Sequence, residues 1–260
     1  MIARVFIGFA VSSAIAALAH RRGALSSSGA LAATAVGAVI FLGGGPWWFT
    51  ALGAFFVTST LLGRVGAAYK ARTKREFSKG DTRDAWQVLA NGGVAAVAAL
   101  LMLVGPDARW LYAFVGALAT ANGDTWATEL GILAPGEPRS ILTWKPVPRG
   151  TSGAVSPLGL AATLAGAFLV ALVASPAGGR PLRLLLVGTV AGVTGALVDS
   201  LAGATVQEQF WCAGCARECE SPRHSCGAVA ERRRGIVGFG NDLVNFAATL
   251  AGALAAAALY

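Results

Sequence analysis

The chain has 260 residues, of which 55% are hydrophobic and only 13% charged, and its mean hydropathy is +0.61. This composition is too apolar for a soluble domain of that length, and it predicts an all-α, polytopic transmembrane helical bundle. The net charge of +8 is therefore interpreted through the lysines and arginines of membrane loops and not through binding to nucleic acid. With 34 glycines, the spans are expected to pack closely through small residues.

Eight apolar segments are expected to cross the bilayer, each close to the roughly 20 residues that a spanning helix needs. They cover residues 2–19, 28–45, 47–64, 86–105, 109–131, 154–175, 181–206 and 235–259. The second segment is short and runs into a Gly-Gly-Gly-Pro sequence at 43–46, so a bundle of seven spans is the alternative. No small-residue cleavage site follows the first segment, which we interpret as a retained helix and not as a signal peptide.

The positions of the basic residues predict the orientation of the bundle. Four connections, at residues 20–22, 64–83, 134–153 and 207–234, fall on one side if there are eight spans. They contain 17 of the 21 lysines and arginines; the other four are Arg4, Arg109, Arg180 and Arg183. Because positive loops stay in the cytoplasm, we expect these four loops to be cytoplasmic and both termini to lie outside, as in a multi-pass protein of a bacterial-type inner membrane.

A polar stretch, Asn122-Gly-Asp124-Thr-Trp-Ala-Thr-Glu129, interrupts the fifth apolar segment. Carboxylates within a span are costly and are candidates for function. Asn122, Thr125 and Glu129 share one helical face and are expected to line a polar cavity. The alternative is that Asp124 pairs with a lysine or arginine only for packing.

Two more acids lie in the last two spans near their cytoplasmic ends. Gln207 follows Asp199 at i+8, and Asn241 and Asn245 accompany Asp242. We expect Asp124, Asp199 and Asp242 to converge from three helices at a similar depth. Carboxylates and amides beside a basic loop suit Mg²⁺ shared with a nucleoside triphosphate, although a proton or sodium pathway would use the same acids.

Two basic segments are candidate phosphate sites. Arg83, Gln87 and Asn91 are spaced i, i+4, i+8 and place a guanidinium above two amides, which suits a phosphate; the amides are otherwise explained by bonds between helices. Further along, Lys145 and Arg149 flank a proline-stiffened turn. The next residues, Gly150-Thr151-Ser152-Gly153, are expected to open the sixth helix and to offer backbone N–H groups at the positive end of its dipole.

The connection at 207–234 contains four cysteines and a histidine within fifteen residues. Clustered thiols in a reducing compartment favour metal ligation over disulfides. Cys212, Cys215, His224 and Cys226 form a complete tetrahedral set for structural Zn²⁺, with Cys219 left over. A reducible disulfide and a loop without any ligand are the alternatives.

Taken together, these motifs resemble the transmembrane-protein-19 family, integral membrane proteins formerly classed as a domain of unknown function and including the phytyl-phosphate kinase of plants. The resemblance rests on Gln87-Val-Leu-Ala-Asn91-Gly, Asn122-Gly-Asp124-Thr-Trp-Ala-Thr-Glu129, Arg149-Gly-Thr-Ser-Gly153, Asp199-Ser-x2-Gly203 and Asn241-Asp-x-Val-Asn245, and covers the chain from about residue 60 onward. It implies phosphoryl transfer from a nucleoside triphosphate, CTP before ATP, to an isoprenoid (phytyl or prenyl) monophosphate.

The site expected from these arguments has three groups of residues. Asp124, Asp199 and Asp242 would hold Mg²⁺ or orient the attacking phosphate, and Asn122, Glu129, Asn241 and Asn245 would complete the polar shell. The phosphates would be held by Arg83, Lys145, Arg149, Thr151 and Ser152. The alternatives are a cytidylyltransferase that forms a CDP-lipid, an ion-coupled or proton-coupled transporter, and a lipid-binding or scaffold protein, which would not need three convergent acids. The lipid chain and the oligomeric state do not follow from the sequence.

Overall fold

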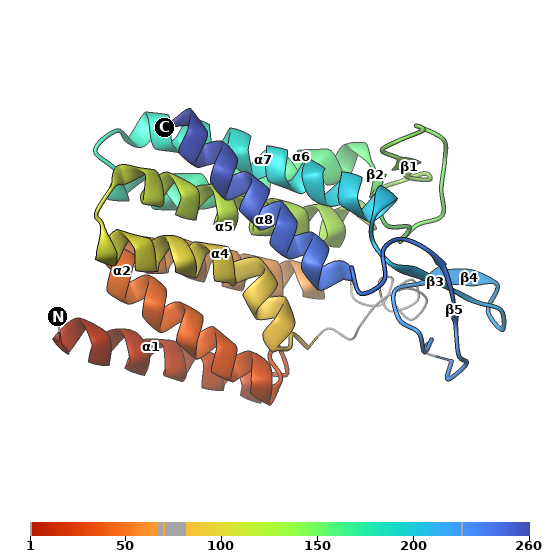
Figure 1. Ribbon diagram of the computed structural model, residues 1–260, viewed down its shortest axis with the longest axis horizontal. Helices are drawn as coiled ribbons and strands as arrows, with labels where there is room; N and C mark the ends of the chain where they lie inside the picture. The colour runs from red at the N-terminus through yellow and green to blue at the C-terminus, as the bar shows by residue number, and fades with distance from the viewer. Residues whose placement is uncertain (1, 67–69, 71–81, 225) are drawn as a thin grey trace.

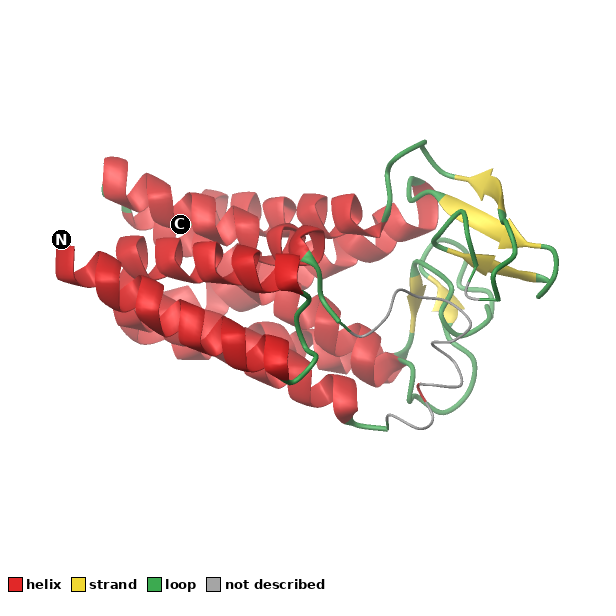
Figure 2. Cartoon of the chain, turned by 90° about the horizontal axis from the view of Figure 1, so that it is seen from below, coloured by secondary structure: helices red, strands yellow, loops and turns green. Residues whose placement is uncertain are grey.

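The computed structural model describes residues 2–66, 70, 82–224 and 226–260. Its core is a bundle of roughly parallel and antiparallel helices, and small strands gather beyond one end of it (Figures 1 and 2). The helices are α1 (Ile2–Arg21), α2 (Ser27–Arg64), α4 (Ala85–Val104), α5 (Ala108–Gly131), α6 (Pro157–Ala174), η1 (Ser175–Ala177), α7 (Pro181–Thr205) and α8 (Asn241–Leu259). Most of the basic segment between α2 and α4, residues 71–81, lies outside the described residues.

Helix α2 is two antiparallel segments joined by a sharp turn. Gly45 has φ +72°, which L-residues rarely adopt, and Pro46 follows it. On a straight helix Gly37 and Phe49 would lie about 18 Å apart. Instead, a methyl group placed on Gly37 would lie 3.4 Å from the Phe49 ring, and the rings of Phe41 and Phe49 contact each other edge to face at 5.5 Å. The chain therefore reverses at the predicted Gly-Gly-Gly-Pro sequence, and the two apolar segments on either side of it are separate.

The polytopic helical bundle predicted from composition is confirmed. Six of the described helices are long and apolar enough to cross a membrane. With α2 folded back on itself and α5 included, the described chain contains eight membrane-length segments, as the sequence predicted. The connections from α1 to α2, from α5 to α6 and from α7 to α8 lie at one end of the bundle, together with the end of α2 and the start of α4. We call this end the loop end, and both termini lie at the other end (Figure 1).

Helix α5 is the centre of the bundle. It packs against α2, α4, α6, α7 and α8, and every residue from Leu111 to Gly123 is buried. Small residues permit this close packing: a side chain on Gly116 would collide with the Gly252 carbonyl of α8. The central position of α5 is what brings its polar last turns, which begin at Asn122, to the middle of the loop end.

Two small antiparallel sheets lie at the loop end. Strands β1 (Arg139–Ser140) and β2 (Ala154–Val155) pair within the connection from α5 to α6. Strands β3 (Gln209–Cys212), β4 (Arg217–Cys219) and β5 (Glu231–Arg234) form a three-stranded sheet in the order β4-β3-β5 between α7 and α8. We call residues 207–234, which contain this sheet and the cysteines, the Cys/His module.

Candidate functional site: two adjoining cavities at the loop end

Two cavities open side by side at the loop end of the bundle. The first has a volume of about 220 Å³ and lies among α5, α6, α7 and the loop that contains Gly150–Gly153. The second has a volume of about 460 Å³ and is lined by residues of α2, α4, α5 and α8. Five residues line both cavities and so form the wall that they share: Asp124, Thr128, Asp199, Glu220 and Asn241.

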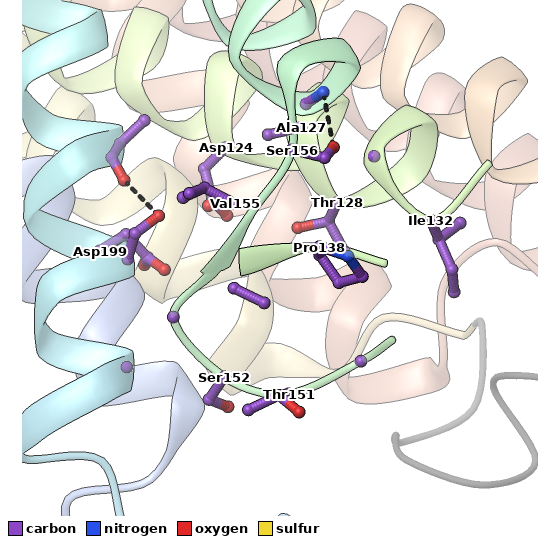
Figure 3. A pocket seen from close by; sticks show the side chains of 18 of the residues that line it. Asp124, Ala127, Thr128, Ile132, Pro138, Thr151, Ser152, Val155, Ser156 and Asp199 are labelled. Atoms are coloured by element: carbon purple, nitrogen blue, oxygen red, sulfur yellow. Dashed lines mark hydrogen bonds between the residues drawn. The ribbon is translucent and has the colours of Figure 1, made fainter. Parts of the chain in front are cut away.

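Two of the three predicted acids lie on this shared wall. Asp124 projects from α5 and Asp199 from α7, and both face the first cavity (Figure 3). They are close enough for their charges to interact. Oδ2 of Asp199 is buried and accepts no hydrogen bond from the described residues. Two neighbouring carboxylates that repel each other, one of them with a buried oxygen that lacks a donor among the described residues, fit a cation, so the residues present suit Mg²⁺.

The loop with Gly150–Gly153 forms the rim of the first cavity. Thr151 and Ser152 lie on that rim (Figure 3). Gly153 has φ +77°, and a methyl group on it would lie 2.6 Å from the Ser200 carbonyl of α7. Because only glycine fits there, the loop can dock directly on α7, near Asp199.

The predicted helix-dipole site at this loop is wrong. Helix α6 begins at Pro157 with Ser156 as its N-cap, and β2 separates it from Gly153. Moreover, the N–H group of Thr151 donates to Pro148 O at 3.2 Å, within the turn. The loop therefore presents the side chains of Thr151 and Ser152 to the cavity, and not a helix N-terminus; the Thr151 hydroxyl also donates to Pro148 O at 2.8 Å. The sequence misplaced the helix start because the apolar run begins three residues earlier, at β2.

Arg149 lines the first cavity, but its guanidinium also binds the protein itself. It donates to the carbonyl oxygens of Ile132 at 2.7 Å and of Gly136 at 2.6 Å. These bonds tie the loop to the chain that leaves α5. In this structure Arg149 therefore shapes the rim, and its contribution to phosphate binding is limited to its charge.

Arg83, Gln87 and Asn91 all line the second cavity, but Arg83 precedes the N-cap of α4 and so lies outside the helical face that the sequence predicted. Asp84 begins α4 as the N-cap in a capping box with Gln87: its carboxylate accepts from Gln87 N at 3.0 Å, and Oε1 of Gln87 accepts from Asp84 N at 3.2 Å. Gln87 thus helps to begin the helix and keeps its amide nitrogen for the cavity. Asn91 Nδ2 donates to Gln87 O at 3.0 Å.

Arginines give the second cavity a positive rim. Arg22, Arg64 and Arg83 all line it. The Arg83 guanidinium lies about 6 Å from the rings of Phe55 and Phe56. Burial lowers the pKa of Arg83, while the nearby Glu129 carboxylate opposes that shift. An arginine stays charged under such burial, so Arg83 brings a fixed positive charge to a lining that also contains carboxylates, and this charge suits an anionic ligand.

Glu129 lines the second cavity but is engaged by a lysine. Nζ of Lys70 lies 2.6 Å from its Oε2 and donates to Leu62 O at 2.6 Å. The pair fixes the last turn of α5 to the end of α2. Glu129 therefore reaches the predicted site as part of a buried ion pair.

Three predicted residues do not reach either cavity. Asn122 is fully buried and bonds helices: its Nδ2 donates to Gly166 O of α6 at 2.7 Å, and its Oδ1 accepts from Thr58 at 3.3 Å. Asp242 lies outside both linings because it is offset around α8 by about 100° from Asn241 and by about 60° from Asn245, which do line the second cavity. Lys145 is exposed in the turn beside β1.

Other residues of the site were missed. Glu220 lines both cavities although it belongs to the Cys/His module, and Gln207 Nε2 donates to it at 3.2 Å. Arg22 and Arg64 were assigned only to membrane topology. Nothing in the sequence near Glu220 or Lys70 distinguishes them from solvated loop residues, and only the folding of distant loops onto the bundle brings them to the site.

The Cys/His module contains the expected group of possible metal ligands. The ligand atoms of Cys212, Cys215, His224 and Cys226 all lie within 4.8 Å of one another. Sγ of Cys212 lies 3.7 Å from Sγ of Cys226. A tetrahedral ion with metal–sulfur distances of about 2.3 Å places two sulfurs about 3.8 Å apart, so the geometry fits zinc. Cys219 lies outside this group and packs in the small core of the module.

Electrostatics within the group also favour ligation. A hydrogen bond with His224 lowers the pKa of Cys226 to about 6, helped by a backbone bond from residue 228 and by Cys215. The pKa of Cys215 rises to about 11, chiefly through its hydrogen bond with Cys226. The Cys226 thiolate is thus held by hydrogen bonds from its neighbours. A bound cation would take the place of the shared protons.

Comparison with known proteins agrees with this architecture. The chain is 34% identical to Protein PGR of Arabidopsis thaliana over 95% of its length and 93% of that protein. It is 31% identical to an uncharacterized membrane protein of Methanocaldococcus jannaschii, with 79% of this chain and 84% of the relative covered. A third relative, an uncharacterized membrane protein of Synechocystis, is 28% identical over 60% of this chain and 62% of its own. No solved structure matches.

The family profile described as "Integral membrane protein DUF92" matches residues 10–253, almost the whole chain. This agrees with the resemblance that the motifs indicated. The chain belongs to the DUF92 family of integral membrane proteins.

Proposed function

We propose that the protein transfers the γ-phosphoryl group of a nucleoside triphosphate, preferably CTP, to an isoprenoid monophosphate and so forms the diphosphate. The observation that carries the proposal is the shared wall: Asp124 and Asp199 stand between a cavity with arginines and a cavity rimmed by hydroxyls. Two phosphate-bearing substrates that bind on either side of this wall would meet at the carboxylates. The choice of CTP and of an isoprenoid comes from the family resemblance.

The two cavities differ in ways that favour one substrate for each. Small-molecule sites typically have volumes of about 300–1,000 Å³, which the second cavity reaches and the first does not. Arg22, Arg64 and Arg83 would balance the high negative charge of a triphosphate. We therefore assign the nucleotide to the second cavity and the phosphate head of the acceptor to the first.

The first cavity also has an apolar exit suited to a lipid tail. Leu160 lines it and is 40% exposed on α6, and Leu164, one turn further, is 55% exposed on the same face. On a membrane helix such exposed leucines face lipid. An isoprenoid chain would lie along this face while its phosphate reaches Thr151 and Ser152.

The reaction asks mainly for positioning and charge balance. An oxygen of the acceptor monophosphate attacks the γ-phosphorus, and the bond to the β–γ bridging oxygen breaks, so that the nucleoside diphosphate leaves. The acceptor is already anionic, and no side chain has to remove a proton. Asp124 and Asp199 would hold Mg²⁺, which supplies charge neutralisation when it is bound with the nucleotide. Arg83 and the Thr151/Ser152 hydroxyls would orient the reacting groups.

We also propose that the loop end faces the cytoplasm and that the Cys/His module binds Zn²⁺. The excess of lysine and arginine in the connections of the loop end favours its placement in the cytoplasm, where nucleotides are available. The Cys₃His group favours Zn²⁺ because three thiolates and one imidazole are its preferred structural ligands. Four protein ligands leave no open position, so that metal would be structural.

Product analysis tests the proposal. Detergent-purified protein with Mg²⁺ is given CTP or ATP together with geranylgeranyl or phytyl phosphate. An isoprenyl diphosphate with CDP or ADP is the expected result. A CDP-lipid with pyrophosphate would make the protein a cytidylyltransferase. Absence of any product from folded protein would contradict both, and flux into proteoliposomes would then test a transporter.

A further inference from the structure

Glu220 stands at the junction between the Cys/His module and the two cavities. It follows directly after β4, in which Cys219 pairs with Phe210 of β3. This register places Glu220 beside the start of β3, next to Gln207 and Gln209. The module, which is otherwise outside the helical bundle, thereby extends one carboxylate to the wall that separates the cavities.

A short polar network holds that carboxylate. Oε1 of Glu220 accepts from Nε2 of Gln207 at 3.2 Å and from Ser152 Oγ at 3.4 Å. Nε2 of Gln209 in turn donates to Ser152 Oγ at 2.9 Å. Gln207 and Gln209 are each only 2% exposed. The network links the module to Ser152 on the rim of the first cavity, so a shift of β4 would disturb this rim.

Glu220 adds a third carboxylate to the wall that Asp124 and Asp199 share. Its charge lies close enough to interact with that of Asp199, which also interacts with Asp124. Three carboxylates on one wall repel one another, and the buried Oδ2 of Asp199 has no donor among the described residues. Asp242, the third acid expected from the sequence, does not line the wall.

We propose that Glu220 is the third carboxylate of the cation site with Asp124 and Asp199, and that the metal in the Cys/His module positions it there. The identity of the cation as Mg²⁺ rests on the proposed function. The positioning rests only on the contacts of Glu220. Two metal sites of different chemistry are thus coupled: a thiolate-bound ion orders a strand whose next residue serves an oxygen-bound ion.

The positioning is tested by hydrogen exchange of the full chain in detergent, with metal content measured in parallel. Glu220→Gln should retain one thiolate-bound metal per chain, because Glu220 is not a ligand. Exchange of amides 150–153 should rise on the order of tenfold, as loss of a charged hydrogen bond implies. Stripping the metal from the wild type should produce the same rise. Glu218→Gln, two residues earlier in β4 and outside both cavities, is the control and should change neither quantity.

Three results would overturn the positioning: wild-type protein without bound metal, unchanged exchange at 150–153 after stripping, or loss of the metal from Glu220→Gln. The carboxylate role is tested by titrating Mn²⁺ and following its electron paramagnetic resonance signal. Glu220→Gln should weaken binding at least tenfold relative to Glu218→Gln. Equal affinities would refute the role of Glu220, whereas no binding even to the wild type would refute the proposed function and the carboxylate role together.

Discussion

The ammonium group of Lys70 lies 2.6 Å from Oε2 of Glu129, and the lysine side chain is only 2% exposed. This pair closes the loop end of α2 against the last turn of α5. Glu129→Gln would leave a buried lysine without its charged partner, which costs about 3–5 kcal/mol in comparable buried pairs. We expect a clear fall in the thermal unfolding temperature of the detergent-purified protein.

Asp107→Asn is the control for that prediction. It breaks an ion pair with Arg109 that is largely exposed at the other end of α5. Solvent-exposed pairs contribute little to stability, so the unfolding temperature should hardly change. Similar shifts for both variants would show that the Lys70–Glu129 pair is no stronger than a surface pair.

Asn122 is expected to stabilise the helix bundle and not to contact substrate. Asn122→Ala removes its bonds to Gly166 and Thr58 and should destabilise the protein by about 1–3 kcal/mol. The KM values of the folded fraction should stay unchanged. Asn91→Ala is the opposite case, because Asn91 lines the second cavity: it should raise the KM for nucleotide more than it lowers stability. A raised nucleotide KM in Asn122→Ala would contradict this division.

Gly153 is expected to be indispensable for docking the cavity rim on α7. Gly153→Ala combines a left-handed backbone, which costs a non-glycine residue about 1–2 kcal/mol, with a collision against Ser200 O. Gly136→Ala is matched to it, because Gly136 also has φ +77° but nothing lies within 4 Å of an added methyl group. Only Gly153→Ala should raise the KM for the lipid phosphate. Equal effects in steady-state kinetics would show that the close approach to α7 is unimportant.

The Cys/His module is expected to depend on its metal for stability. Cys212→Ser removes one of four ligands and should abolish stoichiometric metal binding and lower the unfolding temperature. Cys219→Ser provides the comparison, since that thiol is buried in the same module but lies outside the ligand group. Metal content by mass spectrometry should remain at one per chain in Cys219→Ser. Metal retained by Cys212→Ser would refute the ligand assignment.

Much of the fold follows from the sequence because membrane spans are specified by long apolar runs. Six of the eight segments were predicted to within about two residues of their ends, and the reversal at Gly45–Pro46 is where the glycine run indicated a break. The last segment was predicted to begin at residue 235, whereas α8 begins at Asn241, because the Gly-rich residues before it form a turn. The start of α6 was misplaced because apolar residues of β2 continue into the helix, and periodicity does not distinguish the two. Local patterns thus predicted the helices but not the short sheets of the loop end.

The site was predicted where its residues share one helical face. Gln87 and Asn91 line one cavity together, as their i, i+4 spacing on α4 required, whereas Arg83 reaches the same cavity from the residues before that helix. Asp124 and Asp199 meet because α5 and α7 pack directly. Asn122 and Asp242 were predicted to line the site but do not, because the sequence does not specify how each helix is rotated in the bundle. Lys70 pairs with Glu129, which is 59 residues away in the chain, and Glu220 comes from the separate Cys/His module. No local sequence pattern encodes such contacts.

The most direct test of the central claim is transfer of label from [γ-³²P]CTP to an isoprenyl monophosphate by wild-type protein, Asp124→Asn and Asp199→Asn. Each of the two asparagine variants keeps the shape of the shared wall but removes one of its negative charges. We expect labelled isoprenyl diphosphate from the wild type and a loss of at least a thousandfold in each variant, with unfolding temperatures near that of the wild type. Labelled product from both variants at the wild-type rate would contradict the claim that these carboxylates carry the reaction.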